Sequence, residues 1–199
     1  MRPKLCDVLP RQGVPPVIAS WEAFADALRW GFEAGALPTA GRWWWELRPH
    51  PSHGTLELRV PDAQATVEDA VAVAAFAHSL AAWLAERHDS GDLPPPAATW
   101  RIEQNRWSAC RHGLDAHMAD LRSGALTPAR EVLSQRLDAL APTARALGAA
   151  AGLEGARRLL QANGAERQRQ AGAGGGGARA AAGWLVDAYA ISADGLAAR

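Results

Sequence analysis

The run WWWELRPHPSHGTLELRVPDAQATVEDAVAVAAFAHSLAAWL, residues 43–84, decides the fold class of this chain. Its first part predicts two short strands, Trp43–Arg48 and Thr55–Val60, because residues that favour strands flank a loop with two prolines and a glycine. Its second part predicts a long, largely buried helix that starts at Thr66, since apolar residues recur there at helical spacing. We therefore expect an α+β fold, in which a small antiparallel hairpin packs against a layer of α-helices.

The two predicted strands carry charged residues on one face. Because successive strand residues point to opposite faces, Leu56 and Leu58 fall on an apolar face, whereas Glu57 and Arg59 fall on a charged one, about 6.6 Å apart. Arg48 joins the charged face from the neighbouring strand. A carboxylate there can hold a hard divalent cation, and an arginine can hold phosphate or carboxylate oxygens. The spacing alone favours a simpler arrangement, cross-strand ion pairs on a solvated sheet face.

The rest of the chain is predicted to complete a single domain, residues 1–199. Prolines without an apolar period predict an extended lead-in at 1–19, before a core at 20–170. A glycine-rich joint is expected at 171–178, followed by a last helix and tail at 179–199. Pro142 should end or kink the helix that contains it. Besides the helix after Thr66, helices are predicted at 21–34, 102–112, 128–147, 153–162 and 179–190, with a loose tail after Ile191.

Composition narrows the function classes. The 199 residues hold 21 Lys and Arg against 21 Asp and Glu, so the formal net charge is +0 and a basic nucleic-acid or membrane-binding surface is not expected. The most apolar stretch, 70–84, is shorter than the roughly 20 residues of a membrane helix. Two distant cysteines, Cys6 and Cys110, and an N-terminus without the apolar core of a signal peptide predict a cytoplasmic location.

Other motifs are interpreted structurally. His50 and His53 lack further ligands at metal spacing, and we interpret them as loop residues rather than a zinc site. Cys110 and His112 are two positions apart on a predicted helix and therefore do not face each other. The run of three tryptophans, residues 43–45, indicates core packing more than base or sugar stacking.

Several motifs, taken in order, resemble a known family. They are the tryptophan-rich strand ending in Arg48-Pro49-His50-Pro51, the strand Thr55-Leu56-Glu57-Leu58-Arg59 followed by Asp62, the helix after Thr66-Val67-Glu68-Asp69-Ala70, and Asn105-Arg106-Trp107 leading to Arg111-His112-Gly113-Leu114-Asp115. From about Pro10 to Ala190, the chain resembles the C-terminal half of bacterial carboxylate–amine ligases of the glutamate–cysteine ligase type. The resemblance implies the C-terminal part of a glutamine-synthetase-like fold.

The resemblance also implies an activity and its residues. Such ligases use ATP and Mg²⁺ to phosphorylate a carboxylate, commonly that of glutamate, and an amine then displaces the phosphate to form an amide. By position in the matching motifs, Glu57 resembles a metal-binding carboxylate and Arg59 a catalytic arginine that contacts the nucleotide phosphate. Arg48 is the second catalytic candidate, as a contact for substrate carboxylate or phosphate, and Asn105 and Arg111 are nucleotide-binding candidates.

The half of the family that carries the Glu-x-Glu metal strand is not matched by this sequence. We therefore expect this chain alone to be inactive or very weak, with small-molecule substrates and with a missing N-terminal half or a second copy as partner. Nucleic acid and membrane are not expected as partners. The alternative is a non-catalytic binding or oligomerisation module derived from the same fold. The sequence leaves open which carboxylate and which amine are joined, and whether the chain is a truncated frame, half of a split enzyme or a standalone module.

Overall fold

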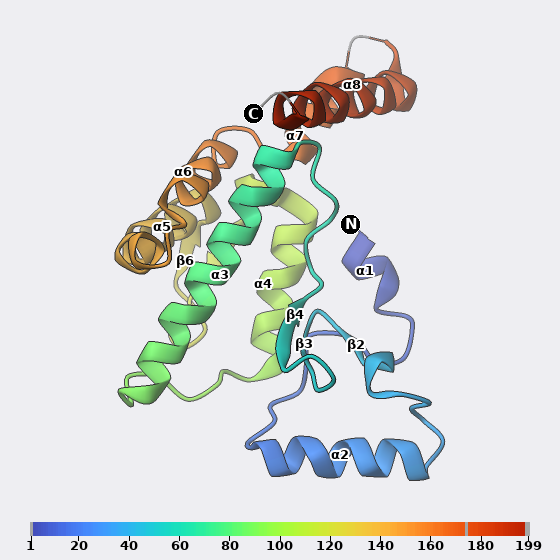
Figure 1. Ribbon diagram of the computed structural model, residues 1–199, viewed down its shortest axis with the longest axis vertical. Coiled ribbons are helices and arrows are strands. Elements are labelled where there is room, and N and C mark those ends of the chain that lie inside the picture. Colours follow the sequence, from blue (N-terminus) through green and yellow to red (C-terminus); the bar gives the residue numbers. More distant parts are fainter. Residues whose placement is uncertain (1, 174, 198–199) are drawn as a thin grey trace. The chain divides into compact units, whose positions relative to one another are not determined.

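A computed structural model describes residues 2–173 and 175–197 (Figure 1). The chain forms two compact units: unit 1 comprises residues 1–61 and 94–129, and unit 2 comprises residues 62–93 and 130–199. Helices dominate and the described strands form three two-stranded sheets, so the architecture is α+β. The parts of the expected lead-in, joint and tail at residues 1, 174, 198 and 199 lie outside the described residues.

Unit 1 contains all the strands that the structure describes. Its elements are α1 (Arg2–Cys6), β1 (Gln12–Gly13), α2 (Trp21–Glu33), the 3-10 turn η1 (Ala40–Arg42), β2 (Trp44–Trp45), β3 (Leu47–His50), β4 (Thr55–Leu58), α4 (Thr99–His112), the 3-10 turn η2 (Gly113–Asp115), β5 (His117–Ala119) and β6 (Leu126–Pro128). Strands β1 and β2 pair in parallel, whereas β3–β4 and β5–β6 are antiparallel hairpins. The predicted hairpin is therefore present, and its strands pair Arg48 directly with Glu57.

The N-terminal expectations need two corrections. The lead-in is not wholly extended, because it contains α1 and β1. The predicted strand Trp43–Arg48 is two strands interrupted at Glu46. The reason is that Glu46 directs its backbone groups to two different neighbours: its N–H donates to the Gly13 carbonyl at 2.9 Å, and its carbonyl accepts from the Arg59 N–H at 2.7 Å.

The tryptophans build the core of unit 1, as expected. Trp43 and Trp45 are buried with Phe24 and Leu37, and the two indole rings stack with centroids 4.5 Å apart. Helix α2 supplies Phe24 to this cluster, and it begins where predicted because the Ser20 hydroxyl accepts from the Ala23 N–H. This cluster fixes the segment that leads into the β3–β4 hairpin.

The β5–β6 hairpin was not predicted. Its turn is held by the Asp120 carboxylate, which accepts from the Arg122 and Ser123 N–H groups, and by Gly124 with φ +79°. Pro128 ends β6 instead of opening the following helix. Short strands of three residues leave too little alternation for a sequence pattern to mark them.

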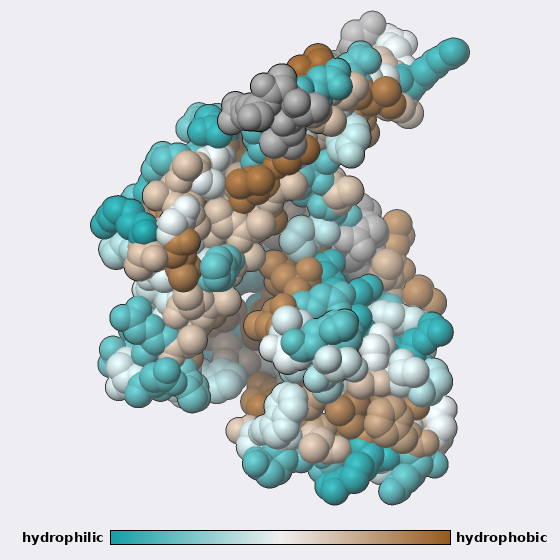
Figure 2. Space-filling model, in the orientation of Figure 1, coloured by the Kyte–Doolittle hydropathy of each residue, from teal (hydrophilic) through white to brown (hydrophobic). Residues whose placement is uncertain are grey.

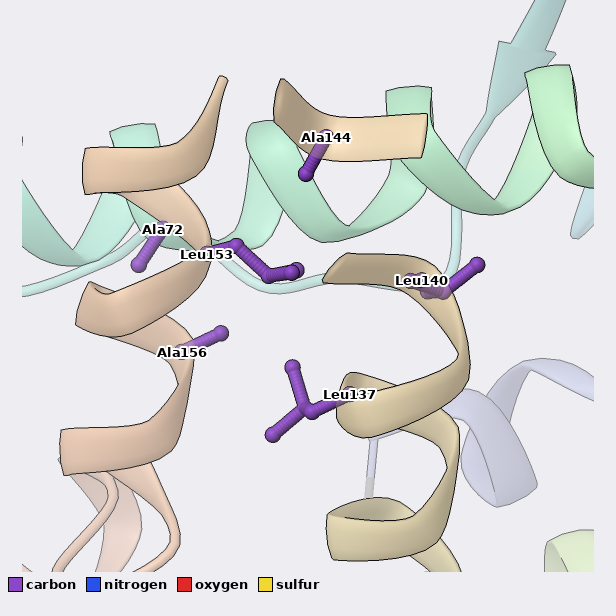
Figure 3. Close-up of a cluster of buried hydrophobic side chains, with 6 residues drawn as sticks. All are labelled: Ala72, Leu137, Leu140, Ala144, Leu153 and Ala156. Carbon is purple, nitrogen blue, oxygen red and sulfur yellow. The ribbon is translucent and has the colours of Figure 1, made fainter. Parts of the chain in front are cut away.

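Unit 2 is helical. Its elements are α3 (Val67–Asp89), α5 (Ala129–Ala146), α6 (Ala150–Leu159), α7 (Gly164–Gly172) and α8 (Gly177–Ala197). Their core joins Ala72 of α3 to leucines of α5 and α6, and Figure 3 shows Leu137 and Leu153 pointing toward each other. Helix α6 packs closely on α3 because Gly152 and Gly155 have no side chains to separate them from Ala75 and Ala72.

Three expectations for unit 2 change. Of the two outcomes expected at Pro142, an end or a kink, the end is excluded, since helix α5 continues to Ala146 with Leu140 and Ala144 completely buried on either side of the proline. Helix α7 was not predicted, and the capping box of Asn163 and Glu166 starts it. The expected tail after Ile191 is helical as far as Ala197, because the Ser192 hydroxyl accepts from the Val67 N–H at 2.9 Å.

Two helices of unit 2 are unusually apolar. Helix α3 has 23 residues, more than the apolar stretch noted in the sequence, and in the described part of the chain it is the one helix long and apolar enough to cross a membrane by length and composition. The expectation that this helix is largely buried is wrong, because 11% of its apolar window is buried and its buried residues are Ala72, Ala75 and Ser79. Helix α8 exposes Val186 and Ile191, and Figure 2 shows hydrophobic side chains at the surface over this helix.

Candidate functional site

The β3–β4 hairpin places the carboxylate of Glu57 between two guanidinium groups. Arg48, its direct cross-strand neighbour, donates from Nε to Glu57 Oε2 at 2.8 Å and from Nη2 to the same oxygen at 2.7 Å. Arg59 donates from Nη1 to Glu57 Oε1 at 2.5 Å. The structure therefore brings together three of the five predicted site residues, and each oxygen of Glu57 accepts from a different arginine.

Arg48 is the buried member of this cluster, with 7% of the residue exposed. Besides Glu57, it donates from Nη1 to the Trp43 carbonyl at 2.5 Å and to the Gly41 carbonyl. A buried arginine is stable only when its donors are matched in this way. Arg48 therefore fixes Glu57 to the tryptophan core and directs none of its three nitrogens to open solvent.

Arg59 is the exposed member, with 37% of its side chain accessible. It also lines a small cavity of about 40 Å³, together with Glu46 and Arg106. An arginine that keeps part of its donor set free can bind a phosphate or carboxylate oxygen through paired N–H groups. Of the three clustered residues, Arg59 is the one placed to meet an anionic ligand.

The electrostatics of Glu57 follow from these contacts. Burial acts to raise the pKa of Glu57, but the hydrogen bonds from Arg48 and then Arg59 outweigh it and hold the pKa below the ordinary value. Glu57 is thus ionised at neutral pH and paired with two cations. A carboxylate whose oxygens already accept from two guanidinium groups attracts a further cation weakly.

The hairpin buries Arg48 on its charged face and exposes the leucines of its apolar face. Leu56 is 57% exposed and Leu58 is 44% exposed, on the face opposite Arg48 and Glu57. The preceding carbonyls of Gly41 and Trp43 explain this orientation, because they draw the Arg48 guanidinium inward. The result is an uncovered leucine surface beside the candidate site.

A second charge cluster, which the sequence did not reveal, lies in the same unit. The side chain of Arg106 is 9% exposed, and its Nε and Nη2 donate to the Glu46 carboxylate at 2.5–2.8 Å. Its Nη1 and Nη2 also donate to the two oxygens of Asp7 at 2.8 Å. The hydrogen bonds that Arg106 donates to these carboxylates raise its pKa, with the bond to Asp7 as the main cause. Arg106 stood in the Asn105-Arg106-Trp107 motif, but its partners are too distant in sequence for spacing to connect them.

Acid should weaken this second cluster. The hydrogen bond from Arg106 lowers the pKa of Asp7 from its ordinary 3.8, so Asp7 contributes stability above that pH and loses it as the pH falls through the lower, folded value. We expect the urea midpoint to fall as the pH is lowered from about 5 to values below 3.8, where the Asp7 carboxylate of the folded protein is protonated, and to fall less in Asp7→Asn. Equal pH profiles for the two proteins, measured by circular dichroism, would contradict this assignment.

The two remaining predicted site residues lie apart from the Glu57 cluster. Asn105 is committed to β5, since its amide donates to the Ala119 carbonyl at 2.7 Å and accepts from the Ala119 N–H at 2.8 Å. Arg111 lies exposed near the end of α4. Asn105 also lines a pocket of about 460 Å³ formed by α4, η2, β5 and β6, whose other polar lining residues are Gln104, Ser108, His112, Asp115 and His117. Asn105 therefore shapes this pocket through the β5 backbone.

Comparisons with known proteins agree with the motif resemblance. The family model described as "Glutamate-cysteine ligase family 2(GCS2)" matches residues 1–182. A protein of Rubrobacter xylanophilus named "Putative glutamate--cysteine ligase 2-3" is 40% identical over 170 residues, which are 85% of this chain and 45% of that protein. The "Glutamate--cysteine ligase" of Natronomonas pharaonis is 30% identical over 170 residues, 85% of this chain and 44% of its own length.

A further relative shows the same partial coverage. The protein named "Putative glutamate--cysteine ligase 2" of Thermobifida fusca is 36% identical over 146 residues, 73% of this chain and 37% of that protein. The chain thus spans less than half the length of these curated relatives.

Proposed function

Since the chain belongs to the glutamate-cysteine ligase family 2, we propose that it is the C-terminal half of an ATP-dependent carboxylate–amine ligase with a glutamine-synthetase-like fold. Because the chain spans about 45% of its relatives' length, the activity is proposed for an assembly that includes the other part. The observation that carries the proposal is the ionised Glu57 between buried Arg48 and exposed Arg59, in a chain that matches the family over residues 1–182. Use of ATP fits a cytoplasmic enzyme.

The proposed reaction has two steps. A carboxylate oxygen of the first substrate, glutamate or another carboxylate, attacks the γ-phosphorus of ATP, the bond to the β-phosphate oxygen breaks, and ADP leaves. The amine nitrogen of the second substrate then attacks the acyl carbon of this acyl phosphate, inorganic phosphate leaves with the oxygen, and the nitrogen loses a proton. Phosphoryl transfer needs positioning and charge stabilisation more than covalent help from the protein.

This chain's own residues have distinct parts in that scheme. Arg59 holds a phosphate oxygen through the donors that Glu57 leaves free, and it stabilises negative charge as the phosphoryl group moves. Glu57 orients Arg59, while Arg48 holds Glu57 in place from the core. Arg111, exposed at the end of α4, remains a nucleotide-binding candidate, and Asn105 supports that region through β5.

A magnesium ion does not fit the residues of this chain taken alone. Both oxygens of Glu57 accept from arginines, and among the described residues no group of three or more His, Cys, Asp or Glu side chains could hold a metal. We therefore assign no step to a metal held here. In the proposed enzyme, Glu57 is at most one ligand, and further carboxylates come from the part of the ligase that this chain does not span.

The exposed leucine face indicates where that other part binds. Leu47 and Leu58 are cross-strand neighbours, Leu56 lies beside them on the same face, and all three are exposed. A two-stranded hairpin is marginally stable by itself, and an apolar sheet face is normally covered. We propose that the N-terminal half of the ligase covers this face, rather than a second copy of the chain.

Reconstitution tests the function and the partner together. We expect the purified chain with Mg-ATP, glutamate and a panel of amines to release no ADP, and to release ADP dependent on both substrates once the N-terminal half of a relative is added. Leu58→Lys should weaken assembly about tenfold or more, since burying a charge costs several kcal/mol, whereas Leu126→Lys, an exposed leucine of the other hairpin, should not. Activity of the chain alone would refute the requirement for a second half, and an inactive but properly folded pair would refute the ligase function. Self-association of the chain through Leu58, measured by sedimentation, would favour the non-catalytic oligomerisation module.

A further inference from the structure

Arg106 binds two carboxylates and lines the same small cavity as Arg59. We propose that Arg106 is a positioning residue of the ligase site. Because Arg106 binds the carboxylates of Glu46 and Asp7, Arg59 stays paired with Glu57 and keeps the orientation in which it can bind phosphate. This inference rests on the proposed function for its catalytic consequence, although the contacts themselves lie within unit 1 of this chain.

The structure shows how firmly Arg106 holds its partners. All three of its side-chain nitrogens donate to carboxylate oxygens, three times to Glu46 and twice to Asp7. The bonds join α4 to residues 60 and 99 positions away in the sequence. A nearly buried arginine with all its nitrogens matched to two carboxylates is held in one orientation, so the carboxylate of Glu46 is held with it.

Glu46 is the carboxylate that competes for Arg59. The Glu46 carbonyl accepts from the Arg59 N–H at 2.7 Å, and Glu46, Arg59 and Arg106 line one cavity of about 40 Å³. A carboxylate released in so small a space is drawn to the remaining guanidinium, because opposite charges attract strongly where little water separates them. Without Arg106, Glu46 therefore takes Arg59 from Glu57.

The charge balance favours the same conclusion. Around the hairpin, the cations Lys4, Arg48, Arg59 and Arg106 face the carboxylates of Asp7, Glu46 and Glu57. Within these ion pairs the cations outnumber the carboxylates by one, which favours an anionic ligand. Loss of Arg106 removes that excess and leaves Glu46 and Asp7 close together without the cation they share.

Three variants separate positioning from simple stabilisation. Arg106→Met removes the donors, and Glu46→Gln combined with Arg106→Met also removes the competing negative charge. If Arg106 had a purely structural role, adding Glu46→Gln would not reverse the effect of Arg106→Met on Arg59. The control is Arg157→Met, because Arg157 also bridges two carboxylates, Asp138 at 2.6 Å and Glu154 at 3.2 Å, but in unit 2.

The first readout is the set of nitrogen NMR signals of the Arg59 guanidinium in the 199-residue chain. These signals are assigned by comparison with Arg59→Lys. We expect its signals to shift in Arg106→Met, to return in the double variant, and to stay unchanged in Arg157→Met. If Arg106→Met does not fold, Arg106→Lys, which keeps the charge with fewer donors, should shift the signals less and in the same direction. Unmoved Arg59 signals in the folded variant would overturn the proposal.

The second readout is kinetic and uses the reconstituted pair. Arg106→Met should raise KM for ATP about tenfold or more, the equivalent of one charge-assisted hydrogen bond, with a smaller change in kcat. The double variant should recover most of that loss. If the Arg59 signals behave as expected but the pair has no ligase activity, the positioning role stands and the proposed function fails. If the pair is active and Arg106→Met leaves both KM and the Arg59 signals unchanged, the positioning role fails and the function stands.

Discussion

Replacing Gly152 with leucine should strongly destabilise unit 2. A Cβ atom at Gly152 meets the Ala75 Cβ at 2.6 Å, closer than two such carbons can approach, and the Val71 carbonyl at 3.4 Å. Helices α3 and α6 must therefore separate, which opens the cluster of Leu137, Leu140 and Leu153 around them. Overpacking of this kind costs about 3 kcal/mol or more when the neighbouring atoms belong to the backbone or are bonded to it and cannot rotate away. We expect a clearly lower urea midpoint by circular dichroism.

The same substitution at Gly183 is the matched control. Gly183 lies within helix α8, is exposed, and has no heavy atom within 4 Å of an added Cβ. Leucine is a better helix former than glycine, so Gly183→Leu should be neutral or stabilise the helix by about 0.5–1 kcal/mol. If Gly152→Leu lowers the stability and Gly183→Leu does not, the difference is due to the α3–α6 contact and not to leucine itself. A Gly152→Leu protein as stable as the wild type would mean that α6 does not pack on α3 this closely.

Sequence patterns predicted the helix starts and the hairpin, which depend on residues that lie close together in the chain. Helices α2 and α3 start where expected because Ser20 and Thr66 each accept a hydrogen bond from the N–H three residues later. The β3–β4 hairpin also depends on neighbouring residues, since its strands are joined by a turn that ends at Gly54 with φ +60°. Each of these features is complete within a few residues, so a pattern in one segment is sufficient.

Long-range pairing explains what the sequence did not predict. Strand β1 exists only because it pairs with β2, about thirty residues later, and the break at Glu46 follows from that pairing together with the bond to Arg59. Alternation in the hairpin predicted correctly which residues share a face, but not which face is buried. That choice depends on the Gly41 and Trp43 carbonyls, which bind Arg48.

In the candidate site, too, contacts between residues close in sequence were predicted and contacts between distant residues were not. Glu57 and Arg59 are two residues apart, so strand spacing alone predicted that they lie together. Arg106 comes from a helix about fifty residues beyond the hairpin, and Asp7 comes from the region after α1, so no spacing rule connects them. The family resemblance identified the segment around Arg106 without indicating what its side chain holds.

Replacing Glu57 with glutamine should lower the ligase activity of the reconstituted pair by about a hundredfold or more, the usual cost of disrupting charge stabilisation in a transition state. A glutamine keeps the shape of Glu57 but offers one acceptor oxygen and places an amide N–H₂ against a guanidinium. Arg48 keeps its bonds to Trp43 and Gly41, so the fold should lose only about 1–2 kcal/mol, whereas Arg59 loses its only side-chain partner in the cluster. The initial rate of ADP release, with both substrates present, measures the effect.

Glu166→Gln separates this effect from general damage, because Glu166 also pairs with an arginine, Arg130, at 2.7 Å, but in unit 2 and within the α7 capping box. We expect Glu166→Gln to reduce stability by about 1 kcal/mol or less, because glutamine keeps the capping box and only the charge of the pair with Arg130 is lost, with little change in the rate per folded molecule. Equal activity in the Glu57→Gln and wild-type pairs would remove Glu57 from the site, even if the pair is a ligase. Equal losses in Glu57→Gln and Glu166→Gln would mean that both act through stability, and the chemistry would then have to be sought around Arg111 instead.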